Sequence, residues 1–169
     1  MPLCASDKLC RAAALPPCRP RRGVTLSGAG AQMNYWLSNA GGATSMVIRA
    51  ADGQLDICGS PAELNAIADS IERLAAGVVL SLGADAAADP RPYDRCLVAL
   101  ETRVTDGPVR VALSGDRVVV TGSVPMMRTF ASYFRFDEGA VRGSQGHHEW
   151  FEGNDYVARD SLPLVVSVG

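Results

Sequence analysis

The pattern of apolar and polar positions becomes regular from residue 46 onward. Residues 46–51 are mostly apolar, Asp52-Gly53 is a typical two-residue turn, and residues 54–58 alternate between polar and apolar. Such alternation is typical of a strand with one buried face, and both turn residues tolerate the positive φ that tight hairpins need. The pattern therefore predicts a β-hairpin over residues 46–58.

A helix is predicted directly after this hairpin. Ser60 is a suitable N-cap, Pro61 suits the first helical position, Glu63 completes a capping box, and Gly77 is a typical residue at the C-terminal end. The apolar residues recur at helical spacing and form one stripe, which predicts the buried face: Leu64, Ile67, Ala68, Ile71 and Leu74.

The same pattern returns 63 residues later. Residues 109–113 alternate, Gly115-Asp116 supplies a turn, and residues 117–121 form the returning strand. The apolar stripe of the second helix coincides with that of the first after this shift, at Met127, Phe130, Ala131 and Phe134. We interpret the agreement as an internal duplication of a strand–strand–helix unit. The alternative is two hairpin–helix units that resemble each other by chance.

The remaining apolar runs predict further strands at 78–82, 96–104, 147–151 and 164–168, with loops at 83–92 and 137–145. Each unit then becomes strand–strand–helix–strand, and hairpin connections favour antiparallel pairing. The predicted fold class is α+β. It is a two-layer domain over residues 46–169, with a mostly antiparallel sheet and two amphipathic helices on one face.

Residues 1–45 depart from this regularity. They contain Pro16-Pro17, Pro20 and three of the five cysteines, and no periodicity beyond a short strand predicted near residues 35–37. We therefore expect a disordered or poorly ordered N-terminal extension. The alternative is a basic arm for targeting or for binding nucleic acid.

Charge and cysteine content limit the class of partner. The net charge is −2, but residues 1–33 carry five basic residues and one acidic residue, whereas the rest carries 11 basic and 17 acidic. We expect no binding to nucleic acid or to a membrane, and an acidic domain favours a basic protein partner. The five cysteines lack a Cys-x-x-Cys pair, which argues against a zinc site. Their odd number, in a sequence where we expect no secretory signal, indicates reduced thiols and a cytoplasmic protein.

The residues most suggestive of chemistry are His147, His148 and Glu149. On a strand, His147 and Glu149 share one face and His148 points to the other, so the two histidines cannot both bind one metal ion. A catalytic zinc site needs a third ligand, which no His/Cys cluster supplies. We expect no metal, no cofactor and no catalytic residue. The alternative function is a small metal-dependent or ligand-handling enzyme that uses these three residues.

The same segment combines aromatic and acidic residues, which favours protein recognition. Aromatic side chains supply binding energy, and acidic side chains attract a basic partner. The alternatives are that Trp150 belongs to the core, or that a sheet edge receives a partner strand. The predicted partner-binding residues are His147, His148, Glu149, Trp150, Phe151, Glu152, Asp155, Tyr156 and Asp160.

These residues also carry a family resemblance. Residues 146–166 read GHHEWFEGNDYVARDSLPLVV, and this order resembles the C-terminal motif of the immunity protein 32 family of bacterial polymorphic-toxin systems. The helix unit from Gly59 to Leu74 is similar to the helix of that family, whereas residues 1–45 depart from its pattern. The resemblance implies a small α+β inhibitor without enzymatic activity that neutralises a partner toxin by direct binding.

Overall fold

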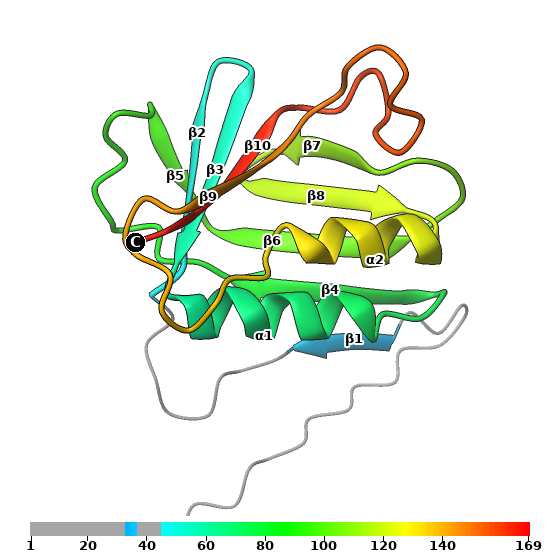
Figure 1. Ribbon diagram of the computed structural model, residues 1–169, viewed down its shortest axis with the longest axis horizontal. Coiled ribbons are helices and arrows are strands. Elements are labelled where there is room, and N and C mark those ends of the chain that lie inside the picture. Colours follow the sequence, from blue (N-terminus) through cyan, green and yellow to red (C-terminus); the bar gives the residue numbers. More distant parts are fainter. Residues whose placement is uncertain (1–32, 37–44) are drawn as a thin grey trace, which may run out of the picture.

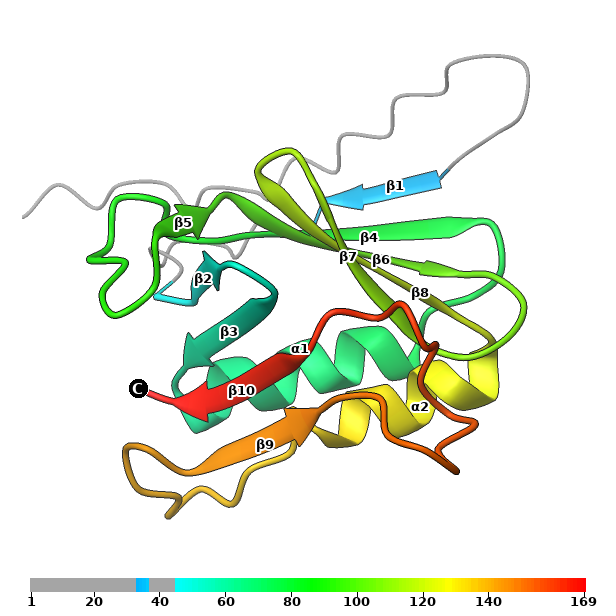
Figure 2. The same ribbon diagram turned by 90° about the horizontal axis from the view of Figure 1, so that it is seen from above.

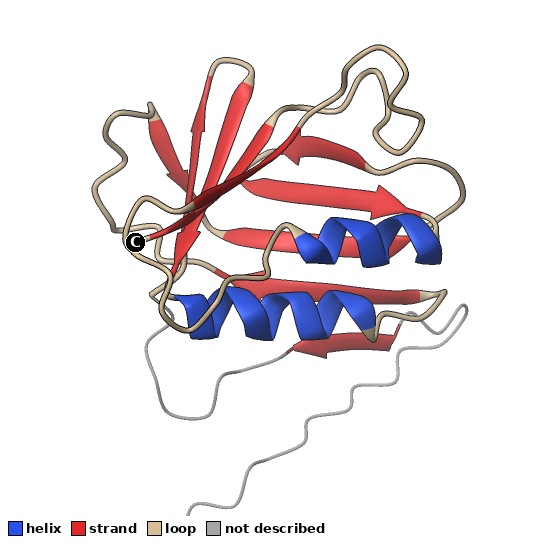
Figure 3. Ribbon diagram, viewed as in Figure 1, coloured by secondary structure: helices blue, strands red, loops and turns tan. Residues whose placement is uncertain are grey.

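A computed structural model of the chain describes residues 33–36 and 45–169, and it confirms the α+β fold class. Within these ranges the strands form two five-stranded sheets, rather than one, together with two helices (Figures 1 and 3). The elements are β1 (Met33–Trp36), β2 (Val47–Ala51), β3 (Gln54–Gly59), α1 (Pro61–Glu72), β4 (Val78–Gly83), β5 (Arg95–Leu97), β6 (Ala99–Val104), β7 (Arg110–Ser114), β8 (Arg117–Gly122), α2 (Val124–Ser132), β9 (Gln145–His148) and β10 (Leu164–Val168).

The two sheets share one pattern of strand pairing. The strand order is β1-β4-β6-β8-β7 in the first sheet and β5-β2-β3-β10-β9 in the second. In the first sheet β6 and β8 are parallel, and both β4–β6 and β7–β8 are antiparallel. In the second sheet β3 and β10 are parallel, and both β2–β3 and β9–β10 are antiparallel. In each sheet four strands are therefore two antiparallel pairs joined by one parallel pairing. The fifth strand differs, because β1 pairs parallel with β4 and β5 pairs antiparallel with β2.

This arrangement reflects the duplication predicted from the sequence. β7, β8 and α2 each begin 63 residues after β2, β3 and α1. The hairpin β7–β8 of the second repeat joins β4 and β6 of the first, and the hairpin β2–β3 of the first repeat joins β9 and β10 of the second. Each repeat thus gives its hairpin to one sheet and two later strands to the other, namely β4 and β6 from the first repeat and β9 and β10 from the second. β5 instead pairs with the hairpin of its own repeat. Figure 2 shows both helices on one side of the first sheet, with β3, β10 and β9 of the second sheet beside them.

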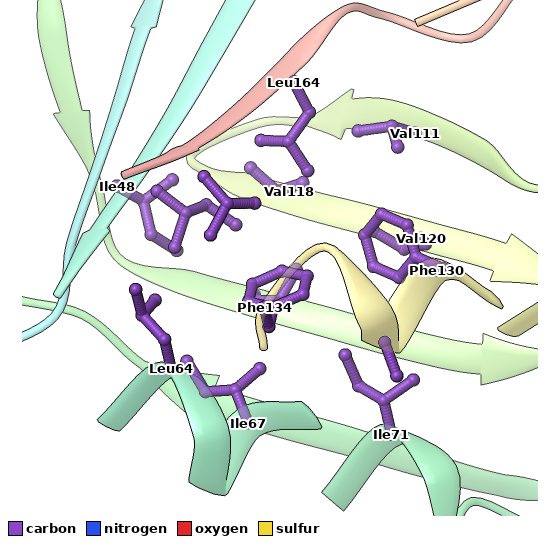
Figure 4. Close-up of a cluster of buried hydrophobic side chains, with 14 of the residues drawn as sticks. Ile48, Leu64, Ile67, Ile71, Val111, Val118, Val120, Phe130, Phe134 and Leu164 are labelled. Atoms are coloured by element: carbon purple, nitrogen blue, oxygen red, sulfur yellow. The ribbon is translucent and has the colours of Figure 1, made fainter. Parts of the chain in front are cut away.

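One hydrophobic core unites both repeats. α1 and α2 pack against each other. Figure 4 shows Ile67 and Ile71 of α1, Phe130 of α2 and Phe134 just beyond the end of α2 beside strand residues of both sheets. The two predicted helical stripes are buried along their whole length. Because all four stripe positions correspond between the repeats, the fold uses each helix in the same way.

The two helices begin differently. Ser60 accepts a hydrogen bond from the Glu63 amide at 3.3 Å, and its own amide donates to Glu63 Oε2 at 3.0 Å, which completes the predicted capping box. Glu63 also accepts a hydrogen bond from the Ser45 hydroxyl at 2.6 Å. Ser123 stands in the corresponding N-cap position of α2 but makes no side-chain capping bond.

The structure corrects the predicted strand over 96–104. This segment is divided at Val98, whose amide donates to the Asp116 carbonyl at 2.9 Å and whose carbonyl accepts from the Ala84 amide at 2.9 Å. Both bonds lie one step beyond the pairing of β6 with β4 and β8, and the chain bends at Val98. Residues before this bend form β5, which pairs with β2 in one sheet, and residues after it form β6 in the other. Gly77, predicted at the helix end, lies instead in the turn between α1 and β4, with φ of +79°.

The predicted N-terminal extension is only partly described. Residues 33–36 form β1, parallel to β4, close to the short strand predicted near 35–37. The predictions for residues 1–32 and 37–44 lie outside the described residues. In the part of the chain that the structure describes, no helix is long and apolar enough to cross a membrane.

Candidate partner-binding loop

The predicted site residues lie mainly on the C-terminal loop, residues 149–163, which connects β9 to β10. β9 ends at His148, so the strand predicted over 147–151 is too long, and Glu149, Trp150 and Phe151 belong to the loop. The pairing of β9 with β10 starts at His148 and Leu164, and the next position on β10 is Pro163. The Pro163 carbonyl accepts a hydrogen bond from the Leu55 amide of β3 at 3.0 Å, so Pro163 faces β3 and not β9.

The second half of the C-terminal loop follows the outer edge of β7. The Val109 amide donates to the Tyr156 carbonyl at 2.9 Å, and the Ala158 amide donates to the Val109 carbonyl at 2.8 Å. Farther along, the Leu162 amide donates to the Val111 carbonyl at 2.8 Å. The Val111 amide donates to the hydroxyl of the buried Ser161 at 3.0 Å. This hydroxyl therefore satisfies an edge amide, which is a structural role.

The tip of the C-terminal loop is held by its own hydrogen bonds. The Asn154 amide donates to the Phe151 carbonyl at 3.0 Å, closing a turn in which Gly153 has φ of +87°. The Asn154 side chain accepts from the Tyr156 amide at 3.1 Å and donates to the Glu149 carbonyl at 3.3 Å. These bonds hold Trp150 and Phe151 on a closed turn.

The exposure of the predicted residues divides them into two groups. Phe151 is 62% exposed and Trp150 is 36% exposed, so Trp150 is not a core residue. His147 and the four predicted acidic residues are also exposed. His148, in contrast, is 0% exposed, and Tyr156 is half-buried. The prediction that His148 contacts a partner is not supported by this placement, because strand alternation turns its side chain inward.

The charges around the exposed aromatic pair are mostly negative. Among the described residues, Glu149, Glu152 and Asp155 form no ion pair. Asp160 pairs with Arg110 at 3.1 Å, and both side chains are more than half exposed, so the pair contributes little to stability. The one basic residue of the loop, Arg159, places its guanidinium carbon 5.3 Å from the centre of the Trp150 ring, a cation–π contact.

An aromatic cluster lies beneath the C-terminal loop. The His148 ring meets the rings of Phe130, Tyr133 and Tyr156 edge to face, with ring centres 5.0, 5.4 and 5.5 Å away. Tyr133 and Tyr156 have nearly parallel rings with centres 6.3 Å apart. Burial lowers the pKa of His148 to about 4, and burial together with the nearby Tyr133 raises the pKa of Tyr156.

The geometry does not favour the metal-dependent alternative. His147 is exposed, His148 is buried, and Glu149 lies beyond the end of the strand. In residues 33–36 and 45–169, no three or more His, Cys, Asp or Glu side chains are placed to hold one metal ion. The alternative therefore lacks a ligand set at the position where the sequence suggested one.

A hollow of about 350 Å³ lies elsewhere, between α1 and β4. Its charged lining residues are Glu63, Asp69 and Arg73. Glu63 is engaged by the α1 cap, and Asp69 forms an ion pair with Arg135 at 2.7 Å. None of the residues predicted to bind a partner lines this hollow.

Sequence reasoning missed three residues that shape the loop, namely Tyr133, Asn154 and Arg159. The Gly153-Asn154 pair is a recognisable turn signal, but the contacts of Tyr133 and Arg159 depend on the tertiary fold. Comparison of the chain with protein families, with curated proteins and with solved structures gives no significant match.

Proposed function

We propose that this chain is a non-enzymatic binding protein whose C-terminal loop contacts a basic protein partner. The observation that carries the proposal is the exposed pair Trp150 and Phe151 on a hydrogen-bonded turn. Aromatic side chains at the centre of an interface supply much of its binding energy, and a turn that is already ordered loses little entropy on binding.

Comparison of the two repeats supports a functional reason for this exposure. The loop between β4 and β6, residues 84–98, occupies the position in the first repeat that the C-terminal loop occupies in the second. It covers the edge of β2 through β5, much as the C-terminal loop covers the edge of β7. No large hydrophobic side chain is exposed on residues 84–98. Covering a hairpin edge in this fold therefore does not require exposed aromatic residues.

The charges support a basic partner. Glu149, Glu152 and Asp155 lie on the same loop as the aromatic pair, are exposed, and form no ion pair among the described residues. Arg159 on the Trp150 ring indicates that this ring already accepts a guanidinium group. An arginine or lysine of the partner would take the place of Arg159 on Trp150 and meet the nearby carboxylates.

The resemblance of residues 146–166 to immunity protein 32 suggests one kind of partner. In this proposal the chain acts in the cytoplasm, binds a protein toxin and neutralises it by direct contact. Such a partner would use the same loop, since the residues that carry the resemblance include the exposed aromatic pair.

The proposal is tested by titrating the chain with the protein encoded by the neighbouring gene and measuring Kd by calorimetry. The double substitution Trp150→Ala/Phe151→Ala should weaken binding by about 30-fold or more, because a central aromatic residue contributes roughly 2 kcal/mol or more. Circular dichroism should show an unchanged fold, since both side chains lie on the loop surface.

The matched control is Val141→Ser, which removes an apolar side chain that is 71% exposed and outside the loop. This variant should bind like the wild type. The charge reversal Glu152→Arg should weaken binding most strongly at low ionic strength, because salt screens exposed charges. Equal affinity of the double variant and the wild type would refute the site, and absence of wild-type binding would refute this partner.

A further inference from the structure

His148 is a buried histidine whose side chain makes no hydrogen bond within the described part of the chain. Its side chain is 0% exposed, and neither ring nitrogen has a partner among the described residues. The hydroxyl of Tyr156, on the loop above it, is also buried and unpaired there. Buried polar groups in proteins are nearly always satisfied, so two unsatisfied groups in contact are unusual and unfavourable.

The surroundings of His148 contain nothing that would stabilise a positive charge strongly. α2 contributes Phe130 and Tyr133, the C-terminal loop contributes Tyr156, and Leu164 of β10 lies opposite in the sheet. The tyrosines are the titratable groups that face the ring, and no charged side chain contributes to the lowered pKa of His148. On its own strand, His147 is exposed on the other face. A protonated His148 therefore needs water, which this enclosure excludes.

The side of the enclosure most easily moved is the C-terminal loop. Phe130 belongs to the shared core and Tyr133 caps the C-terminal end of α2, whereas Tyr156 lies on a loop attached by a few backbone hydrogen bonds. The Tyr156 amide donates to Asn154, the residue that closes the turn carrying Trp150 and Phe151. Displacement of Tyr156 would therefore loosen the turn itself.

We propose that His148 is an acid-sensitive latch for the C-terminal loop. Neutral His148 lets Tyr156 close over it and keeps Trp150 and Phe151 ordered. Protonated His148 takes up water, displaces Tyr156 and releases the turn, so that partner binding weakens in acid. The regulatory consequence rests on the proposed function, whereas the release of the loop is a property of the free protein.

The latch is tested on the full chain without a partner. Trp36→Phe leaves Trp150 as the single tryptophan, so that fluorescence quenching by acrylamide reports its accessibility from pH 7.5 down to about pH 3, below the pKa of His148. In the same samples, NMR titration follows the ring protons of His147 and His148, and far-ultraviolet circular dichroism monitors the global fold. We expect Trp150 to become more accessible with a midpoint that matches the titration of His148, before global unfolding.

Two variants separate the latch from general effects of acid. His148→Phe fills the aromatic enclosure without a titratable group, and it should abolish the acid-induced change at Trp150. His147→Gln removes the neighbouring exposed histidine and should leave the change intact.

Persistence of the transition in His148→Phe would overturn the proposal. So would titration of His148 in the wild type without a change at Trp150, or the absence of any transition before acid unfolding. The wild-type measurements decide the matter even if His148→Phe does not fold. These results do not depend on a partner, so failure of the latch is distinct from failure of the binding proposal.

Discussion

The two repeats have the same elements but use them differently. In the first repeat α1 has a complete capping box and an aliphatic stripe, and residues 84–98 cover the hairpin edge without exposing a large apolar side chain. In the second repeat α2 lacks a side-chain cap, and Phe130 of α2 and Phe134 just beyond it occupy the corresponding stripe positions. The loop after β9 exposes Trp150 and Phe151. The first repeat shows that this fold can cover a hairpin edge without exposed aromatic side chains. The exposed pair Trp150 and Phe151 is therefore a feature of the second repeat alone.

The additions of the second repeat are also connected to one another. Phe130 contacts both Phe134 and His148, and Tyr133 contacts both His148 and Tyr156. A continuous set of aromatic contacts therefore leads from the core, through α2, to the loop with the exposed pair. In the first repeat the corresponding positions of α1 are Ile67 and Ile71, which cannot form such ring contacts.

The largest difference between the repeats should appear when a core residue of each helix is truncated. Phe130→Ala should lower the free energy of unfolding by about 3–5 kcal/mol, and Ile67→Ala by about 2–5 kcal/mol, as measured by urea denaturation. Only Phe130→Ala should also increase hydrogen exchange in the C-terminal loop, because its ring supports His148. Equal loosening of that loop by Ile67→Ala would contradict the separation of the two repeats.

Acid is expected to lower the free energy of unfolding by an intermediate amount, through His148 of the second repeat. The pKa of His148 is about 4 in the folded protein, compared with 6.5 for an ordinary histidine, so the unfolded chain binds more protons between these values. The stability that neutral His148 provides is complete above pH 6.5, falls as the pH decreases, and stops falling below about pH 4. At 1.36 kcal/mol per pKa unit, the total loss is about 3 kcal/mol.

This prediction is checked by urea denaturation of the wild type and of His148→Phe between pH 7.5 and pH 4. The difference between their free energies of unfolding should change across this interval in favour of the variant. A constant difference would mean that His148 does not titrate differently on folding. No counterpart is expected in the first repeat, because the two histidines of the chain are His147 and His148.

The smallest expected difference between the repeats is the loss of unfolding free energy when each helix cap is removed. Ser60→Ala removes the capping hydroxyl of α1 and should lower the free energy of unfolding by about 1 kcal/mol. Ser123→Ala should cost only a few tenths of that amount, because Ser123 makes no side-chain capping bond. Thermal unfolding of both variants at pH 7 provides the comparison, and equal losses would show that the two caps are energetically equivalent.

The Glu63 carboxylate in the cap of α1 also makes the stability of the protein depend on pH. Burial alone would raise the pKa of Glu63, but hydrogen bonds from Ser45 and Ser60 outweigh this and leave the pKa below its ordinary value. The stability from this carboxylate is therefore present above its ordinary pKa of 4.5 and is lost as the pH falls through the lower folded value. It affects a more acidic range than His148 does, so the two contributions can be separated.

Much of the fold could be predicted because local signals agree with it. The hairpin turns at Asp52-Gly53 and Gly115-Asp116, the cap at Ser60 and the stripes of both helices all depend on residues close together in the chain. The spacing of 63 residues between the two repeats follows from the same signals. The division into two sheets could not be predicted, because it depends on which hairpin pairs with β6 and which with β10, and these pairings join distant parts of the chain.

The candidate site, too, could be predicted only in part from the sequence. The sequence by itself determined that aromatic and acidic residues gather between residues 147 and 160, and strand alternation correctly separated His147 from His148. Only the tertiary structure decided that β9 ends at His148, that Trp150 and Phe151 face solvent, and that His148 is enclosed by α2 and Tyr156. The physical reason is that alternation and turn propensity act over a few residues, whereas burial depends on which distant elements pack against the chain.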